Sequence, residues 1–158
     1  MTNAPSLKPD IEQSVLAFAK AFRQYPSESF ASDLFSQFPK NCCEYASLLL
    51  AWFLSEEHQC TAFEIVKGGL KDDREQMHLW LRLEGQNIDI TAYQFDADLP
   101  PLLVTQTGGW HDRYSLISVE SFDDKFYEQY HDDSRDDIVD DYRALAHLAR
   151  EGKGGTWK

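Results

Sequence analysis

The chain has 158 residues, with 27 Asp or Glu against 15 Lys or Arg, which gives a formal net charge of −12. This length fits one domain, residues 1–158, and 42% hydrophobic residues with 13% aromatics argue against intrinsic disorder. The charge disfavours nucleic acid and anionic membranes as partners, because both bind clustered Lys and Arg. No apolar run is long enough to span a membrane and no secretion signal opens the sequence, so we expect a cytoplasmic protein.

The first third of the chain predicts two helices. Residues 10–24 repeat apolar side chains with a helical period, whereas residues 27–40 show no clear period. Residues 41–54 predict the stronger helix, which Asn41 can cap. Beyond its first turn this helix is apolar on nearly every side, a pattern typical of a helix buried at the centre of a domain.

The remainder predicts strands and then a last helix. Residues 60–66 favour a strand, and the polar residues 67–77 predict a loop that could close as a lid. Residues 78–91 alternate apolar and polar side chains around a turn and predict a hairpin. Further strands are predicted at 102–105 and 114–119, and an acidic helix at about 134–150. This order favours an α+β fold with an antiparallel sheet.

The hairpin brings two titratable residues to one face. Its Leu and Ile residues must share the core face, which fixes the pairing register. The predicted pairs are Arg82 with Asn87, Trp80 with Asp89, and His78 with Thr91. His78 and Asp89 then become diagonal neighbours on the polar face, where a carboxylate can orient an imidazole and stabilise its protonated form.

The three cysteines are Cys42, Cys43 and Cys60. Their number and spacing fit neither a disulfide scaffold nor a zinc or redox motif. With Asn41 as the cap, Cys42 is the first residue of the buried helix, where free amides and the helix dipole stabilise a thiolate. A buried structural thiol is the alternative. If the polar face of the hairpin packs over this helix end, Cys42, His78 and Asp89 supply a nucleophile, a base and an orienting group.

Two segments resemble a known family. They are Asn-Cys-Cys-Glu-Tyr-Ala-Ser-Leu-Leu-Leu at 41–50 and His-Leu-Trp-Leu-Arg-Leu-Glu-Gly-Gln-Asn-Ile-Asp-Ile-Thr at 78–91. Together they resemble the transglutaminase-like branch of the papain-like cysteine enzymes, in which a Cys opens a helix and His-x-Trp and Asp-x-Thr strands follow. The resemblance covers about residues 39–95 and is similar in scale to small bacterial cysteine peptidases. It implies a papain-like core, a Cys-His-Asp triad and no cofactor.

The sequence also departs from the family pattern. Lys40-Asn41 replaces the glycine that often precedes the nucleophile, and Leu79 replaces the Ala that follows the His. Cys43 is the alternative nucleophile, although the spacing to Glu44 and Ala46 favours Cys42.

Three other residues are candidates for the site, each with an ordinary alternative. Gln37 stands about where papain-like enzymes keep an oxyanion glutamine, but a chance glutamine is the simpler interpretation. Trp80 shares the polar hairpin face and is otherwise a packing residue. His111 could line the cleft or cap a loop. A metal site from Cys42, Cys43, His78 and His111 is not required by any spacing, so we expect no metal.

The sequence therefore predicts a cysteine-dependent acyl-transfer enzyme that acts on an amide or peptide bond in a peptide or protein. Peptidase, amidase, deamidase and transglutaminase activities all remain open. The alternative is an acidic, immunity-type binding protein that neutralises a basic partner on a papain-like scaffold without turnover. Residues 120–141 hold ten acids and two bases and would form the docking edge, or else a solvated face on which Asp140 and Asp141 both point to solvent.

Overall fold

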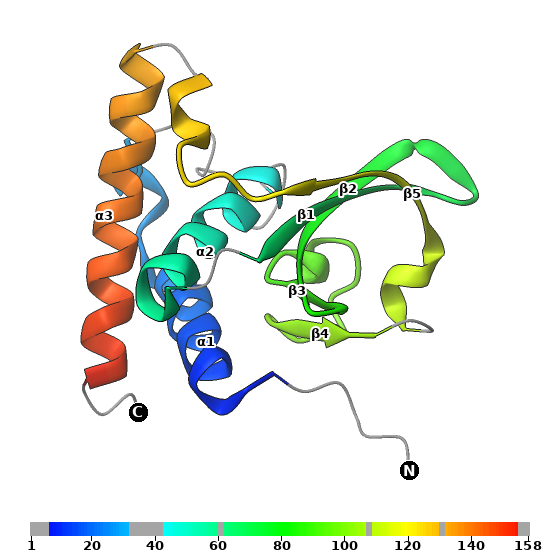
Figure 1. Ribbon diagram of the computed structural model, residues 1–158, viewed down its shortest axis with the longest axis horizontal. Coiled ribbons are helices and arrows are strands. Elements are labelled where there is room, and N and C mark those ends of the chain that lie inside the picture. Colours follow the sequence, from blue (N-terminus) through cyan, green and yellow to red (C-terminus); the bar gives the residue numbers. More distant parts are fainter. Residues whose placement is uncertain (1–6, 32–42, 60–61, 107–108, 130–131, 155–158) are drawn as a thin grey trace.

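The computed structural model describes residues 7–31, 43–59, 62–106, 109–129 and 132–154 (Figure 1). Within these ranges the helices are α1 (Pro9–Gln24), α2 (Cys43–His58) and α3 (Asp132–Gly154). The strands are β1 (Phe63–Leu70), β2 (Asp73–Leu83), β3 (Gln86–Asp89), β4 (Leu103–Thr105) and β5 (Tyr114–Ser121). Two short 3-10 turns, η3 (Ala92–Gln94) and η4 (Trp110–Arg113), follow β3 and precede β5. The predicted mixture of helices with an antiparallel sheet is confirmed.

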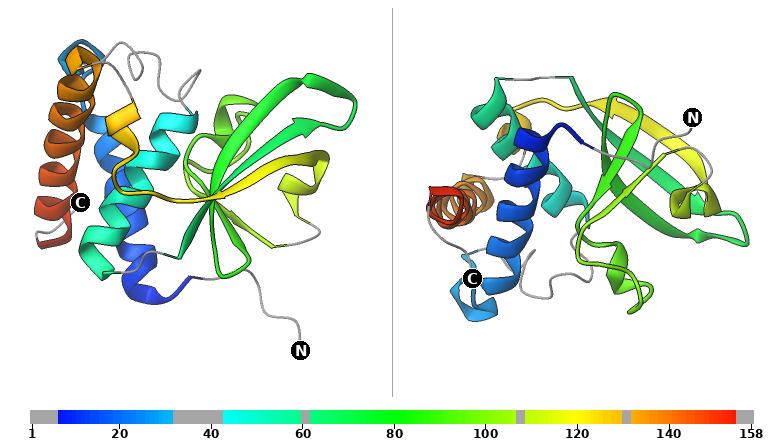
Figure 2. Two further views of the ribbon diagram at one scale, coloured as in Figure 1. Left: turned by 45° about the horizontal axis from the view of Figure 1, so that its top comes forward. Right: turned by 90° about the horizontal axis from the view of Figure 1, so that it is seen from below.

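The helices form layers beside the sheet. In Figure 2 the order is α3, α1, α2 and then the sheet, and α2 contacts both α1 and β2. This central position explains why α2 is apolar all round, since it buries side chains toward both neighbours. None of the helices in the described ranges is long and apolar enough to cross a membrane.

The five strands are ordered β4-β3-β2-β1-β5, and each neighbouring pair is antiparallel. One face of the sheet joins the helices in the main core, to which Ile65, Leu81 and Ile88 belong. Val66, Trp80 and Tyr114 form a smaller cluster of their own. Because side chains alternate along a strand, the polar residues that alternate with the Leu and Ile of β2 and β3 lie on the face of Trp80.

The predicted hairpin is confirmed where its strands pair. Arg82 pairs with Asn87, as expected, and the flanking pairs are Leu81 with Ile88 and Leu83 with Gln86. The turn uses positive φ angles of 51° at Glu84 and 81° at Gly85. The other predicted pairs, Trp80 with Asp89 and His78 with Thr91, lie beyond the end of this ladder.

The prediction of a loop or lid over residues 67–77 is wrong. β1 continues to Leu70 and β2 already begins at Asp73, so these residues form most of a second hairpin, which projects beyond the core in Figure 1. Residues 71–77 are exposed on both faces of this hairpin. A strand solvated on both sides has no apolar–polar alternation, so its sequence resembles that of a loop. β1 also carries an irregularity in its pairing with β5, between Lys67 and Gly68.

The last helix is longer than predicted, and one of its acidic residues is buried where exposure was predicted. α3 runs from Asp132 to Gly154, past both predicted ends. Asp140 is exposed as expected, but the expectation for Asp141 is wrong, because that residue is 1% exposed. Its Oδ1 accepts a hydrogen bond of 2.6 Å from the backbone N–H of Ala31, a distant partner that satisfies the buried carboxylate.

Candidate active site

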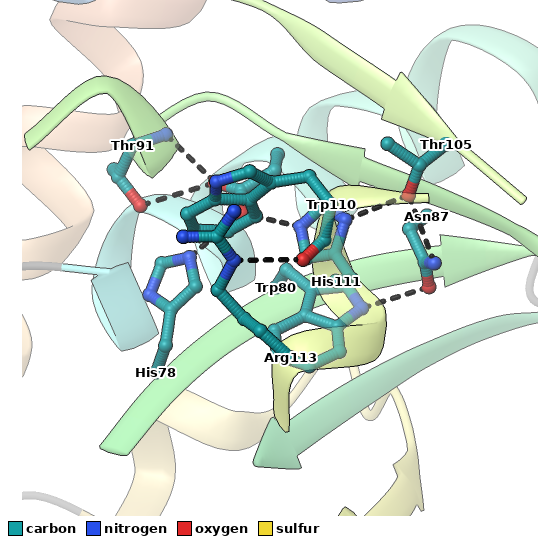
Figure 3. A network of polar contacts seen from close by, with 9 residues as sticks. His78, Trp80, Asn87, Thr91, Thr105, Trp110, His111 and Arg113 are labelled. Carbon is teal, nitrogen blue, oxygen red and sulfur yellow. Dashed lines mark hydrogen bonds and ion pairs between the residues drawn. The ribbon is translucent and has the colours of Figure 1, made fainter. Parts of the chain in front are cut away.

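Asp89 is the centre of a buried polar network. Figure 3 labels the residues around it, among them His78, Thr91 and His111. Its Oδ2 lies 2.7 Å from Nε2 of His78 and 2.7 Å from Nε2 of His111. Its Oδ1 accepts hydrogen bonds from the backbone N–H of Thr91 at 2.9 Å and from the Thr91 hydroxyl at 3.3 Å. The carboxylate therefore has four donors around it, and its residue is only 2% exposed. It is positioned by β3, which ends at Asp89, and by the turn that follows.

The two nitrogens of the His78 ring have different surroundings. Nε2 is bonded to Asp89, whereas Nδ1 is buried and has no partner at hydrogen-bonding geometry in the part of the chain that the structure describes. Cys43, the first described residue of α2, lies close enough to the ring to raise the pKa of His78. The buried imidazole thus interacts with a carboxylate and has a thiol nearby.

The pKa values reflect this arrangement. Burial by itself lowers the pKa of His78, but the charge and hydrogen bond of Asp89, with a further contribution from Cys43, raise it from 6.5 to about 9. Burial by itself raises the pKa of Asp89, yet His78 and the hydrogen bond from His111 hold it below its usual range. His78 and Asp89 therefore form an ion pair near neutral pH.

The ion pair predicts a pH dependence of stability. Because the folded-state pKa of His78 is raised, its contribution is complete below about 6.5 and is lost as the pH rises to about 9. The Asp89 contribution, from a depressed pKa, is present above about 3.9 and is lost only in stronger acid. We expect urea denaturation to show wild type losing its advantage over His78→Gln between pH 6.5 and 9. A difference that stays constant over this range would contradict the ion pair.

A chain of hydrogen bonds lies behind His111. The Trp80 indole N–H donates to Asn87 Oδ1 at 2.8 Å, and Asn87 Nδ2 donates to Thr105 Oγ1 at 3.1 Å. Thr105 Oγ1 lies 2.7 Å from Nδ1 of His111. These residues come from β2, β3, β4 and η4, so the network ties one half of the sheet to the turn before β5 (Figure 3).

Aromatic rings surround His78. The ring of Phe95 lies 4.9 Å from the His78 ring between centroids, and that of Trp110 lies 6.1 Å from it. Two buried donors, Trp110 Nε1 and Gln94 Nε2, have no hydrogen-bond partner within the described ranges. Buried donors in native proteins are usually paired, so an unpaired donor beside an imidazole is available to a bound molecule.

A groove lies between the first turns of α2 and the sheet. It has a volume of about 350 Å³, and its lining includes Glu44, Leu48, Lys67 and Glu120. Glu44 directly follows Cys43 in the chain, so the groove reaches the beginning of α2 between that helix and the sheet.

The structure brings together several of the residues predicted from the sequence. His78 and Asp89 are in contact, and His111, for which a loop cap was the favoured interpretation, is bonded to the same carboxylate. Trp80 is buried and donates into the network as well as packing. Cys42 and Gln37 lie outside the described residues.

Sequence analysis missed two members of the network, Asn87 and Thr105. Asn87 could have been found, because it alternates with Ile88 and therefore shares the face of Asp89. Thr105 ends a short strand of three residues, and nothing in its sequence context indicates a polar partner.

Three of these residues have the spacing of a metal site. Ligand atoms of His78, Asp89 and His111 lie within 4.8 Å of one another. Each imidazole Nε2, however, already makes a 2.7 Å hydrogen bond to Oδ2 of Asp89, so a metal ion would have to displace both protons. Two His and one carboxylate fall short of the four ligands that structural zinc takes, although their number matches the three protein ligands of catalytic zinc. The hydrogen-bonded network accounts for the cluster, and the absence of a metal remains a prediction.

Comparisons of the chain with protein-family models, with curated proteins and with solved structures give no significant match. A functional assignment therefore depends on the geometry of the site itself.

Proposed function

We propose that the chain is a cysteine-dependent acyl-transfer enzyme that acts on an amide or peptide bond, and that its core is papain-like. The observation that carries this proposal is that the two ring nitrogens of His78 have different partners. Nε2 is committed to the buried Asp89 carboxylate, which leaves Nδ1 as the nitrogen that can exchange a proton with the nearby Cys43 thiol. A nucleophile, a base and an orienting group in this order are the basis of thiol acyl transfer.

The nucleophile of this proposal is Cys43. The sequence spacing favours Cys42, but Cys43 is the thiol that acts on His78 in the described part of the chain. It also lies at the start of α2, the end of a helix that attracts negative charge.

The reaction proceeds in two stages. Because His78 is protonated in its ion pair with Asp89, Cys43 reacts as the thiolate, and its sulfur forms a bond to the amide carbonyl carbon. Protonated His78 then gives its Nδ1 proton to the departing amine as the carbon–nitrogen bond breaks, which leaves a thioester on Cys43 and a neutral imidazole. Water, or a second amine, gives a proton to Nδ1 of His78 as it attacks the thioester, and the release of the acid or the new amide restores the thiolate and the protonated His78. Asp89 keeps the imidazole in the required tautomer and stabilises its protonated form.

Two features support a peptide or protein substrate. The groove beside Glu44, which directly follows Cys43, has both charged and apolar lining, which suits an extended chain. The unpaired indole N–H of Trp110, beside His78, is available to a substrate carbonyl oxygen.

We expect iodoacetamide at pH 6 to alkylate Cys43 at least about tenfold faster in the folded protein than in the urea-unfolded chain, because a neighbouring imidazolium favours the reactive thiolate. Mass spectrometry with fragmentation of the Cys42-Cys43 peptide measures each rate separately. His78→Ala should slow Cys43 to the unfolded rate.

The matched control for that variant is His147→Ala, which removes an exposed histidine paired only with Glu151 among the contacts of the described residues. It should leave the labelling rate unchanged. Fast labelling of Cys42 in place of Cys43 would transfer the role to that residue. Slow and equal labelling of all three cysteines would rule out the acyl-transfer proposal.

A second candidate function is neutralisation of a basic partner without turnover. It is supported by the exposed acids after β5, which are Asp123, Asp124 and Glu128, together with Glu120 on that strand. Capture of a basic protein that weakens with salt and survives Cys43→Ala would favour this function over catalysis.

A further inference from the structure

We propose that His111 is a positioning residue for Asp89, which it holds toward His78 by donating a hydrogen bond at the end of a one-directional chain of donors. This series of hydrogen bonds begins at the indole of Trp80. This inference rests on the proposed function, since it gives His111 a role in preparing His78 for proton transfer. His111 touches neither the thiol nor any reacting atom in the proposed reaction.

The direction of the chain follows from what each group can do. An indole N–H only donates, so the 2.8 Å contact from Trp80 fixes the oxygen of the Asn87 side chain toward it. The Asn87 amide nitrogen then faces Thr105 and donates to its hydroxyl at 3.1 Å. That hydroxyl, having accepted one hydrogen bond, has its own proton to give to Nδ1 of His111 at 2.7 Å.

The last step orients His111. An imidazole that accepts at Nδ1 carries its proton on Nε2, and Nε2 lies 2.7 Å from Oδ2 of the Asp89 carboxylate, which can only accept. Every donor in the chain therefore points toward Asp89. Its members are almost completely buried, with exposures of 2% for Trp80, 8% for Asn87, 6% for Thr105 and 3% for His111. Water therefore has little access to replace any of these bonds.

Asp89 needs this donor because burial favours the protonated, uncharged form of a carboxyl group. The titratable groups that act on it within the described ranges are His78 from β2, His111 from η4 and Tyr114 from β5. Cys43 from α2 acts on His78 and Tyr114, and Arg113 from η4 acts on Tyr114. His111 lowers the pKa of Asp89 by its hydrogen bond and by charge, and the hydrogen bond helps to keep the carboxylate ionised as the pH falls.

The test compares His111→Gln with His111→Phe, because one variant keeps the hydrogen-bond donor and the other keeps the packing of the ring. Gln retains an N–H near the position of Nε2 but loses the ring. Phe retains a flat ring against Trp80 and Trp110, whose centroids lie 4.6 and 5.0 Å from that of His111, but it donates nothing. The readout is the rate of Cys43 alkylation by iodoacetamide as a function of pH.

We expect His111→Gln to keep the wild-type pH profile. In His111→Phe the acid limb of the profile, which is the fall in alkylation rate at low pH, should move up by about one pH unit, because Asp89 then takes up a proton more readily. The reverse pattern, in which Phe behaves like wild type and Gln does not, would assign His111 a packing role and overturn the proposal. Wild-type behaviour of both variants would also overturn it.

Two further measurements keep the proposal open to refutation. If His111→Phe does not fold, Thr105→Val is the test variant and Thr105→Ser is its control. The acid limb of the alkylation profile should then move to higher pH in Thr105→Val and stay unchanged in Thr105→Ser. Failure of the proposed function is visible separately, as slow Cys43 labelling in wild type. In that case the carbon-13 NMR titration of Asp89 decides, and a midpoint that does not rise in His111→Phe would overturn the role of His111.

Discussion

Asp89→Asn should lower the free energy of unfolding by about 2–4 kcal/mol and slow Cys43 alkylation at pH 6 about tenfold. All four groups that contact the carboxylate are donors, two from Thr91 and one each from His78 and His111. An asparagine amide offers one oxygen and one NH2 group, so at least one buried donor would face another donor. The protonated His78 would also lose its counter-charge, and its pKa would fall from about 9.

Urea denaturation and peptide-resolved alkylation measure the two effects. Asp124→Asn is the control, since it makes the same chemical change at an exposed position and should shift stability by less than about 0.5 kcal/mol. Above pH 9, where His78 loses its proton, the part of the loss that depends on charge should shrink. A variant as stable and as reactive as wild type would show that the network does not prepare His78.

Gly68→Ala should cost about 1–3 kcal/mol and also slow Cys43 alkylation. A Cβ at this position would lie 2.7 Å from Cβ of Tyr114 and 3.1 Å from the Trp80 ring. The Tyr114 atom is attached directly to the backbone of β5 and cannot rotate away. Gly68 also pairs with His78 across β1 and β2, and the rings of Trp80 and Tyr114 each lie 5.7 Å from that of His78.

The control for this variant is Gly85→Asn in the hairpin turn. A Cβ there has no heavy atom within 4 Å, and the φ of 81° lies in the left-handed region that Asn tolerates. Its stability should stay within about 0.5 kcal/mol of wild type. Unfolding measured by circular dichroism separates the two glycines, and equal costs would show that the close packing behind His78 is not limiting.

The parts of the fold that sequence predicts are those with a local period. Alternation in the 78–91 hairpin places His78 and Asp89 on one face, and the structure joins them by a 2.7 Å bond. His111 lies 22 residues beyond Asp89 in a 3-10 turn, and no period relates the two. The buried position of Asp141 likewise depends on a backbone amide 110 residues away. Such partners come from tertiary packing, which a single sequence does not display.

The adjacent cysteines show the same limit at the site. Consecutive residues on an ideal helix point about 100° apart, so sequence spacing alone does not say which of two adjacent thiols would face a given partner. Which of the two meets His78 depends on where the helix begins and how it is rotated against the sheet. Spacing to Glu44 and Ala46 favours Cys42, whereas the thiol that acts on His78 in the described chain is Cys43.

The pairing irregularity between β1 and β5 has a consequence for solubility. Among the described strands β5 is an edge strand, and it exposes Leu116 at 58%, Ile117 at 43% and Val119 at 37%. A straight apolar edge of this kind is a template on which a second copy can add its own strand. A bulge bends such an edge and breaks its regular spacing, here opposite Lys67 and Gly68. Bent in this way, and on a molecule of net charge −12, the edge is a poor surface for aggregation.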